Sequence, residues 1–498
     1  MGIPFYFKKI FTNFPDILQD KHGLPNANLF LDFNGIIHQC SHKVTKNEHF
    51  TNADIFESIR EYLDFLNDYF KPTLIYIAVD GVAPLSKIKQ QRQRRFKTIF
   101  YRKERKKIFD RHGQSNNEWN SNCITPGTEF MEQLNKFLGT LTIPNVIVSG
   151  SDEKGEGEHK IFTYIKKHNI DNIIIHGLDA DLIMLSLLMV EKTIVIYREN
   201  ENESTYLNIN MLRSHIVNNI NDQINFETTK KSIIYDYVLI CFLLGNDFLP
   251  KVNSLDIIVT NGLNIIEGLY ISILNKYKKH LVVDCEINPI FFKQLLLELS
   301  SLENRNILKA NKKYMNKRYF NKHSDQCEIE LHKLEFYPLF HKKNIRYDNI
   351  FDWKHDYYNY YFKNTDIREV IKQYLIGLNW ILSYYINNTS TTNWYYPYFN
   401  SPFIVDIVDY LQHNELPKYT ECIDFEITEE IQLCSVLHKD SHYLLPKKLR
   451  NISTDLSYLY PVTFKIDTHM CTYLHQCMPF IPNFNISDIN NYIIQNTK

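Results

Sequence analysis

The sequence predicts an α/β protein with a mixed, mainly parallel central sheet flanked by helices and a mainly helical second region packed against it. Two observations lead to this prediction. Over residues 1–260, short apolar runs rich in β-branched residues alternate with helical stretches, as in parallel sheets buried on both faces. From Trp353 onward, the character changes to dense aromatic clusters.

Four apolar runs in the first region are predicted strands, and each ends at carboxylates or leads into them. The runs are residues 28–31, 74–79, 146–148 and 173–175. The acids that follow them are Asp32, Asp80, Glu156, Glu158, Asp179 and Asp181. Ligands bind such sheets beyond the carboxyl ends of the strands, so we expect these acids to gather at one edge of one sheet.

Helices are predicted between these strands. Asp54–Tyr69 has helical apolar spacing and fits a crossover between the first two strands. Lys87–Arg111 is a long basic segment without Gly or Pro, which predicts a helix. Thr125 and Pro126 are typical of an N-cap followed by Pro at the first helical position. Ile233–Leu244 is predicted as an apolar helix that leads into Asp247.

Three parts are expected along the chain. Residues 1–260 form the core with the acids, residues 261–345 a variable linker or helical insertion, and residues 346–498 the aromatic-rich region. The stretch 270–345 is lysine-rich and expected to be less regular. Within it, Lys309–Lys322 is predicted to be a solvated linker or a surface helix.

Composition limits the class of protein. With 498 residues, 44% apolar and 23% charged, the chain fits a soluble globular protein of two or more lobes. A formal net charge of −1 predicts no polyanion partner by itself, so a nucleic-acid surface would need local asymmetry. Nine cysteines without paired spacing predict free thiols in a reducing compartment. No apolar run reaches the roughly 18–20 residues of a membrane span.

The pattern of the acids favours a metal site. Asp179 and Asp181 lie at i and i+2, on one side of an extended chain, and Glu156 and Glu158 repeat that spacing between glycines. A lone pair of this kind is weak evidence, because Asp commonly caps a following helix. Together with Asp247, the set is typical of sites that bind two Mg²⁺ ions about 3.5–4 Å apart for phosphodiester hydrolysis. Mg²⁺ prefers oxygen ligands, and Mn²⁺ is an expected substitute.

A basic helix face follows Asp80. Lys87, Gln91, Arg94 and Arg95 fall at i, i+4, i+7 and i+8, which is one face of a helix. Such a face could hold a terminal phosphate through charge-assisted hydrogen bonds. A solvated basic face or a localisation signal is the alternative, and the short distance from Asp80 favours phosphate binding.

Long motifs in a fixed order resemble the XRN family of 5′→3′ exoribonucleases. The matching segments are residues 1–4, 31–34, 79–84, 90–96, 121–131, 155–160, 177–185, 245–250 and 394–397. The resemblance implies a core like that of PIN-domain and flap nucleases. It also implies an enzyme that removes nucleotides one at a time, processively, from single-stranded RNA with a 5′-monophosphate, releasing nucleoside 5′-monophosphates in RNA decay.

The resemblance also assigns roles by motif position. The metal-binding acids would be Asp32, Asp80, Glu156, Glu158, Asp179, Asp181 and Asp247, and the 5′-phosphate pocket would be Lys87, Gln91, Arg94 and Arg95. His38 and Trp394 match residues that stack on bases, although a lone His is more often a surface or core residue. The tyrosines near Trp394 read as core packing.

Some features depart from the family. The chain stops soon after the second conserved region, so we expect a compact member with catalytic regions only. Lys154 stands where Pro is common, and Leu85-Ser86 replaces a more basic pair. His469, Cys471, His475 and Cys477 could indicate zinc, but the spacing is unfamiliar and helix packing is the favoured interpretation.

Two other functions remain open: a flap-type structure-specific endonuclease, which shares the acids, and a catalytically inactive RNA-binding scaffold. Release of mononucleotides from 5′-monophosphate RNA distinguishes the exonuclease from a flap enzyme, and loss of activity in Asp179→Asn excludes a scaffold. Further expectations are decapping factors as candidate partners, a monomer, no membrane association, and a cytoplasmic location, which the absent zinc-knuckle insertion favours.

Overall fold

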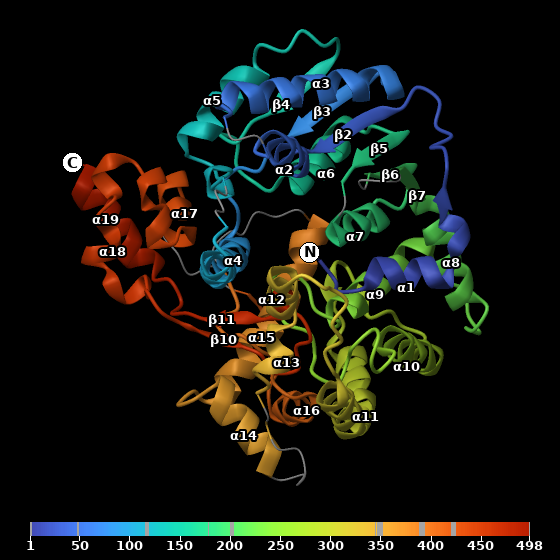
Figure 1. The fold of residues 1–498 in the computed structure, drawn as a ribbon. Coiled ribbons are helices and arrows are strands. Elements are labelled where there is room, and N and C mark those ends of the chain that lie inside the picture. The colour runs from blue at the N-terminus through green and yellow to red at the C-terminus, as the bar shows by residue number, and fades with distance from the viewer. Residues whose placement is uncertain are drawn as a thin grey trace.

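The computed structural model describes residues 2–46, 49–114, 119–177, 179–199, 204–343, 345, 352–387, 394–419 and 425–497. Its centre is a seven-stranded sheet with strand order β1-β7-β6-β5-β2-β3-β4 (Figure 1). The strands are β1 (Leu18–Gln19), β2 (Asn28–Asp32), β3 (Leu74–Ala78), β4 (Val146–Ser149), β5 (Ile173–His176), β6 (Ile194–Glu199) and β7 (Ser204–Asn208). The five strands from β6 to β4 are parallel, and β7 and β1 add antiparallel pairs at one edge.

Nine helices in the described part of this region surround or adjoin the sheet. They are α1 (Tyr6–Asn13), α2 (Phe33–Val44), α3 (Asn52–Phe70), α4 (Leu85–Arg111), α5 (Glu129–Leu138), α6 (Gly157–His168), α7 (Ala180–Leu188), α8 (Ile209–Asn221) and α9 (Lys230–Phe242). Alternate strand residues face opposite sides. On β2, Leu29 and Leu31 pack with α2, α3 and α5, whereas Phe30 packs with α6 and α7. The result is a three-layer α/β/α core (Figure 1).

The second region is mainly helical and continues the same core. Its helices are α10 (Gly262–Tyr277), α11 (Pro289–Asn316), α12 (Gln326–Glu335), α13 (Tyr337–Phe340), α14 (Asp352–Tyr361), α15 (Ile367–Asn387), α16 (Ile404–His413), α17 (Glu429–Val436), α18 (Ile452–Asp455) and α19 (Ile486–Thr497). Two short hairpins accompany them, β8 (Val282–Val283) with β9 (Glu286–Ile287), and β10 (Lys465–Asp467) with β11 (Met478–Phe480). Buried residues of α9, α10, α11 and α15 belong to one hydrophobic cluster with the sheet.

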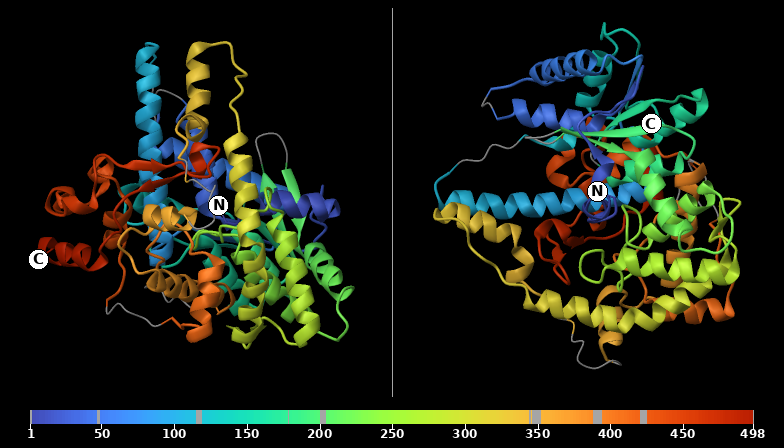
Figure 2. Two further views of the ribbon diagram at one scale, coloured as in Figure 1. Left: turned by 90° about the horizontal axis from the view of Figure 1, so that it is seen from below. Right: turned by 90° about the vertical axis from the view of Figure 1, so that its right-hand side faces the viewer.

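Helix α4 links the parts of the molecule. Its first turns pack with α17 and α19, and its distal end packs with α12 and the loop between β10 and β11. Figure 2 shows α4 projecting from the body, with α12 against its distal end. Because this one helix contacts both the α/β core and the C-terminal helices, its basic side chains lie between them.

The fold class is confirmed, and two local predictions are wrong. The helix predicted with Thr125 as N-cap begins three residues later, at Glu129, because the side chain of Thr128 accepts the capping hydrogen bond from the Met131 amide. Residues 270–345 are more regular than expected, since α11 is a helix of 28 residues that includes much of Lys309–Lys322. The boundaries at residues 260 and 345 stay predictions, and the second adjoins residues 346–351, outside the described residues. Among the described helices, none is long and apolar enough to cross a bilayer.

Candidate active site

The predicted acids lie at the carboxyl ends of the parallel strands. Asp32 ends β2, Asp80 follows β3, and Glu156 and Asp179 immediately precede α6 and α7. Glu158 and Asp181 lie in the first turns of those helices. Helix N-termini carry a partial positive charge, which favours carboxylates there.

The simplest alternative to metal binding was helix capping. Asp32, Glu156 and Asp179 occupy the N-cap positions of α2, α6 and α7, yet none of the three side chains accepts a capping hydrogen bond from its own helix. Helix capping therefore does not explain why these carboxylates stand at strand ends.

The structure brings all seven acids within range of mutual repulsion. Burial, together with repulsion from Asp80 and Asp179, raises the pKa of Asp32 to about 8. Burial raises the pKa of Asp181 to about 7, and the Asp247 carboxylate adds to the effect. The pKa of Glu158 is raised as well, chiefly by burial. A buried set of like charges of this kind calls for a cation.

Lys87 supplies one positive charge inside the cluster. Its Nζ lies 2.6 Å from Oε2 of Glu156, 3.1 Å from Oδ2 of Asp247 and 3.9 Å from Oε1 of Glu158. Although burial alone would lower the pKa of Lys87, these acids raise it, so the ammonium is charged. Burial alone would raise the pKa of Asp247, but Lys87 holds it below its ordinary value.

Neighbouring backbone amides and side chains orient two of the acids. The Gly157 amide donates to Oδ1 of Asp80 at 2.7 Å. Asp247 accepts from the Gly2 amide at 3.1 Å and from Nε2 of Gln90 at 3.1 Å. The N-terminal segment therefore reaches the site, which no local sequence pattern indicated.

The helical second region also reaches the acids. On α15, the Tyr384 hydroxyl donates to Oε1 of Glu156 at 2.8 Å, and the Tyr385 hydroxyl donates to Oδ1 of Asp181 at 2.9 Å. From the sequence these two tyrosines were noted only as part of the aromatic-rich region. Their rings are buried, and their hydroxyls are part of the site.

The four residues of the predicted phosphate face have different environments on α4. Lys87 lies among the acids, whereas Gln91 is buried and accepts from Nε2 of Gln432 at 3.3 Å. Arg95 is buried and donates to Oγ1 of Thr125 at 2.6 Å. Only Arg94 is exposed. Binding of a 5′-phosphate by these residues stays a prediction.

His38 and Trp394 also differ in environment. Part of the His38 side chain on α2 is exposed. The protein around its ring removes water that would stabilise the protonated form, and Arg94 and Arg95 repel a positive charge, so the pKa of His38 is lowered to about 4. The structure thus brings His38 together with part of the basic face. Trp394 is 8% exposed, donates from Nε1 to Gln373 and packs 5.4 Å from the Trp380 ring. Little of its ring is open to a base, and both stacking roles stay predictions.

The donor set fits hard divalent cations. Glu156, Glu158 and His159 each offer a ligand atom, and these atoms lie within 4.8 Å of one another. The other acids surround this group. Most of these ligands are carboxylates, which Mg²⁺ and Mn²⁺ prefer. The pKa values of Asp32, Glu158 and Asp181 are raised, so the negative charge of the group is not balanced by the positive charges of the protein around it. His159 was not predicted as a ligand, although its place next to Glu158 was a signal.

The four His and Cys residues near the C-terminus are not themselves part of an α-helix, but Cys471 and Cys477 pack against helices, in line with the favoured interpretation. They lie between β10 and β11, where Leu474–Gln476 forms only a 3₁₀ turn. Among the described residues they form no group that could hold a metal ion. Cys477 packs instead with Ile108 of α4 and Cys327 of α12.

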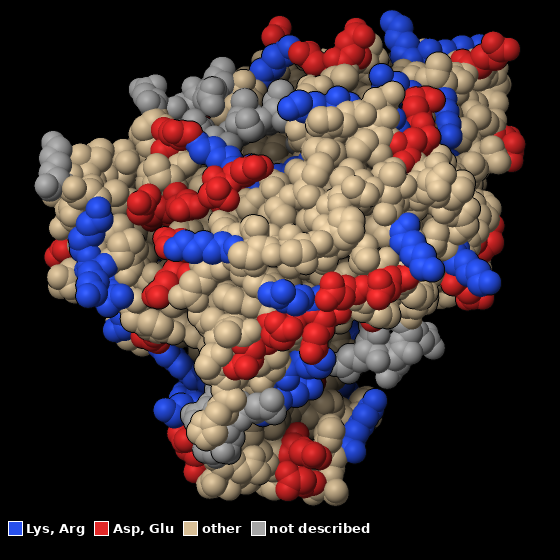
Figure 3. Space-filling model, turned by 90° about the horizontal axis from the view of Figure 1, so that it is seen from above, with Lys and Arg blue, Asp and Glu red and all other residues tan. Residues whose placement is uncertain are grey.

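Charge on the face of the molecule over α3 is mixed. Figure 3 shows the face over α3, where Lys and Arg are interspersed with Asp and Glu in its described part. What sets the basic residues of α4 apart from other basic residues is therefore their position beside the acids. The net charge of the whole chain is only −1.

Comparison with known proteins adds family evidence. A family model described as "XRN 5'-3' exonuclease N-terminus" matches residues 1–200, and one described as "Xrn1 helical domain" matches residues 225–337 and 341–486. Together the two models account for most of the chain.

Curated relatives agree with these matches. The chain is 30% identical to 5'-3' exoribonuclease 1 of Homo sapiens over 94% of its own length and 32% of the relative. It is 27% identical to the Schizosaccharomyces pombe 5'-3' exoribonuclease 1, over 97% of the chain and 47% of the relative. It is 24% identical to the 5'-3' exoribonuclease 2 homolog of Drosophila melanogaster, over 97% of the chain and 69% of the relative. The chain thus spans less than half the length of the first two relatives.

Proposed function

Because the chain belongs to the XRN family of 5′→3′ exonucleases, we propose that it is a 5′→3′ exoribonuclease that hydrolyses single-stranded RNA with a 5′-monophosphate and acts in RNA decay. The observation that carries this proposal is the group of seven acids that the fold brings together at the carboxyl edge of the sheet, six of them buried or partly buried and Asp179 exposed, with Lys87 of the basic helix among them. An acid group of this kind suits phosphodiester hydrolysis, and the basic helix suits recognition of the RNA end.

Seven carboxylates with one lysine leave an excess of negative charge that would repel RNA. Bound Mg²⁺ or Mn²⁺, as a pair of ions, would offset this charge, activate water and stabilise the leaving oxygen. Glu156, Glu158, Asp181 and Asp247 surround the Lys87 ammonium, and Asp32, Asp80 and Asp179 complete the group. The residues of the chain would hold the scissile phosphate in place and exclude bulk water.

Selection of the RNA end would come from α4. Arg94 is exposed beside His38, so a 5′-phosphate bound by Arg94 would place the first base near the imidazole. His38 is neutral near pH 7 because its pKa is about 4, which suits stacking on a base better than ion pairing. Arg95 would add a second guanidinium from the buried side of the helix.

The test compares one RNA with a 5′-monophosphate, a 5′-hydroxyl or a cap. We expect rapid release of nucleoside 5′-monophosphates from the first substrate only, in Mg²⁺ but not in EDTA. Equal rates on all three ends would overturn end selection. Cleavage of a DNA flap without mononucleotide release would favour a flap endonuclease. If wild type and Asp179→Asn both left RNA intact, the chain would be an inactive binder.

Processivity is tested separately with a heparin trap added after binding. Continued shortening of bound RNA is expected, because a strand held at its 5′ end is not released between cycles. Decapping partners, the monomeric state and a cytoplasmic location stay predictions from the sequence.

A further inference from the structure

We propose that Tyr384 and Tyr385 are positioning residues for two metal-binding carboxylates, so that α15 of the helical region completes the active site. This inference rests on the proposed function, because it takes Glu156 and Asp181 to be metal ligands. It assigns to two aromatic residues of the second region a role that their sequence context did not indicate.

The two hydroxyls engage different acids. Tyr384 donates to Oε1 of Glu156 at 2.8 Å, and Tyr385 donates to Oδ1 of Asp181 at 2.9 Å. Tyr384 and Glu156 are 228 positions apart in the sequence, and Tyr385 and Asp181 are 204 positions apart. Adjacent positions on α15 therefore hold acids from two different strand ends, one before α6 and one in α7.

Both oxygens of Glu156 are directed by these contacts. Oε1 accepts from Tyr384, while Oε2 lies 2.6 Å from the Lys87 ammonium. A tyrosine hydroxyl donates only one hydrogen bond, so Tyr384 fixes the rotation of the carboxylate and leaves Oε2 facing the centre of the acid group. A cation in that centre would meet an oriented ligand.

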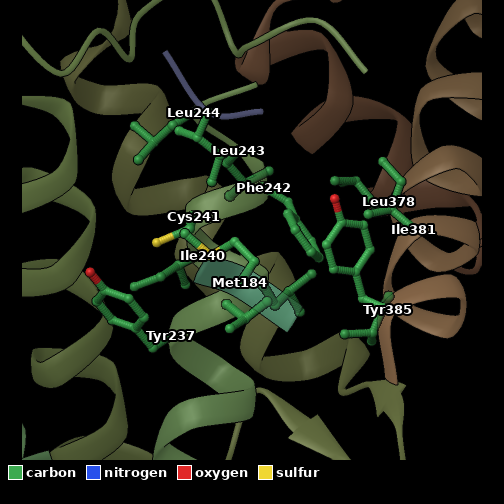
Figure 4. Close-up of a cluster of buried hydrophobic side chains, with 14 of the residues drawn as sticks. Met184, Tyr237, Ile240, Cys241, Phe242, Leu243, Leu244, Leu378, Ile381 and Tyr385 are labelled. Carbon is green, nitrogen blue, oxygen red and sulfur yellow. The ribbon is translucent and has the colours of Figure 1, made fainter. Parts of the chain in front are cut away.

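Aromatic packing holds the tyrosine rings in place. The Tyr384 ring stacks on Trp380 at 4.9 Å, and His159 lies 3.8 Å away on centroid distance. Tyr385 packs against Phe242 at 4.8 Å, where Figure 4 shows it reaching from α15 toward the residues of α9. Rings confined in this way cannot swing their hydroxyls away from the carboxylates.

The alternative is that both tyrosines serve only as core packing. The two interpretations differ in what happens when the hydroxyl alone is removed. Partners that orient a metal ligand typically contribute about 10–100-fold in metal affinity or activity. If a tyrosine serves only as core packing, its change to Phe would lower the stability of the protein and leave its affinity for metal unchanged.

The chain offers a matched control. The Tyr270 hydroxyl also donates to a buried carboxylate, Oδ2 of Asp236, at 2.8 Å, and it lies outside the acid group. Tyr270→Phe therefore removes the same kind of hydrogen bond from the same kind of environment. Any general effect of losing a buried tyrosine–carboxylate bond appears in this variant.

The experiment measures Mn²⁺ binding by electron paramagnetic resonance for wild type, Tyr384→Phe, Tyr385→Phe and Tyr270→Phe. We expect Mn²⁺ to bind about 10–100-fold more weakly to the first two variants, and with wild-type affinity to Tyr270→Phe. Unchanged Mn²⁺ affinity in both Tyr384→Phe and Tyr385→Phe would overturn the inference. If one variant does not fold, the other decides, since each acts on a different acid.

Kinetics add a second readout. With 5′-monophosphate RNA, the two variants should need more Mg²⁺ for half-maximal kcat, with KM for RNA close to that of wild type. A rise in KM alone would contradict positioning of metal ligands. Failure of the proposed function gives a different result: wild type itself would neither bind Mn²⁺ nor degrade RNA.

Discussion

The Nζ atom of Lys87 lies 2.6 Å from Oε2 of Glu156 and 3.1 Å from Oδ2 of Asp247, so one lysine from the basic helix is the counter-charge of the acid group. Its side chain is only 15% exposed. A lysine in this position links two parts of the site. One is the group of acids at the sheet edge, and the other is the helix that we propose binds the 5′ end of the RNA.

Lys87→Met is expected to destabilise the metal-free protein. Removing one partner of a buried ion pair leaves uncompensated carboxylates and typically costs about 3–5 kcal/mol. The free energy of unfolding in EDTA, measured with urea, should fall by about this amount, and Mg²⁺ should restore more stability to the variant than to wild type. Lys106→Met, an exposed change on the same helix, is the control. Equal stability of Lys87→Met and wild type in EDTA would contradict this role.

The raised pKa of Asp32 predicts how the stability of the metal-free protein depends on pH. Its pKa is raised to about 8, so the folded state keeps a proton that the unfolded chain has lost above about pH 4. The stability it contributes is therefore fully present below the unfolded pKa and is lost as pH rises toward 8. In EDTA, the melting temperature should fall between pH 6 and 8.

Asp32→Asn should flatten this slope, and Mg²⁺ should flatten it in wild type, because a bound cation replaces the proton. Asp181, with a pKa of about 7, adds a slope of the same sign. An Asp32→Asn variant with the full wild-type slope would show that other groups cause it.

The sequence was most informative where function depends on local pattern. Apolar β-branched runs predicted β2 to β5, and their ends placed Asp32 and Asp80 at one edge. Contacts between distant segments were not predictable. Tyr384 and Glu156 are 228 residues apart, and Gly2 and Asp247 are 245 apart, so no local pattern could pair them.

Short polar signals were misleading for a different reason. Thr125-Pro126 has the composition of a helix start, but Thr125 instead accepts from Arg95 and donates to the Asn122 carbonyl. A tertiary contact thus uses the side chain that a cap would need. Three residues later, the Thr128 hydroxyl donates to the Cys123 and Thr125 carbonyls and also accepts from the Met131 amide, which caps α5.

Arg94→Ala should weaken discrimination between RNA ends. Arg94 is the exposed guanidinium of the predicted phosphate face, and hydrogen bonds to charged groups contribute about 1.5–3 kcal/mol. The ratio of kcat/KM for 5′-monophosphate over 5′-hydroxyl RNA should fall by about 10–100-fold. Arg105→Ala, farther along α4 and packed over Phe109, should keep the wild-type ratio. An unchanged ratio in Arg94→Ala would exclude phosphate binding by this residue.

Arg92→Met tests how α4 holds the C-terminal region. The Arg92 guanidinium is 1% exposed and donates to the backbone carbonyls of Ser435, at 2.6 Å, and Leu459. Loss of the donors leaves two buried carbonyls unsatisfied, at about 1–3 kcal/mol each. Urea unfolding should show a loss of about 2–6 kcal/mol, and hydrogen exchange should speed up within residues 425–497 first. Uniform exchange across the chain would argue against this local link.

Gly157→Ala tests how closely the acids must be placed. A Cβ atom at this position would lie 2.8 Å from the Ala78 carbonyl oxygen and 3.2 Å from Oδ1 of Asp32. The first turn of α6 would have to shift, taking with it the amide that donates to Asp80. A misplacement of about 1 Å can reduce a rate by about 100-fold, so kcat on 5′-monophosphate RNA should fall by that order.

Gly268→Ala is the matched control for this change. It lies within α10, where an added Cβ has no neighbour within 4 Å, and Ala is favoured over Gly in a helix by about 1 kcal/mol. This variant should be as active as wild type and slightly more stable. Wild-type kcat in Gly157→Ala would mean that the backbone at α6 tolerates the shift, and that the position of the Gly157 amide beside Asp80 does not limit the reaction.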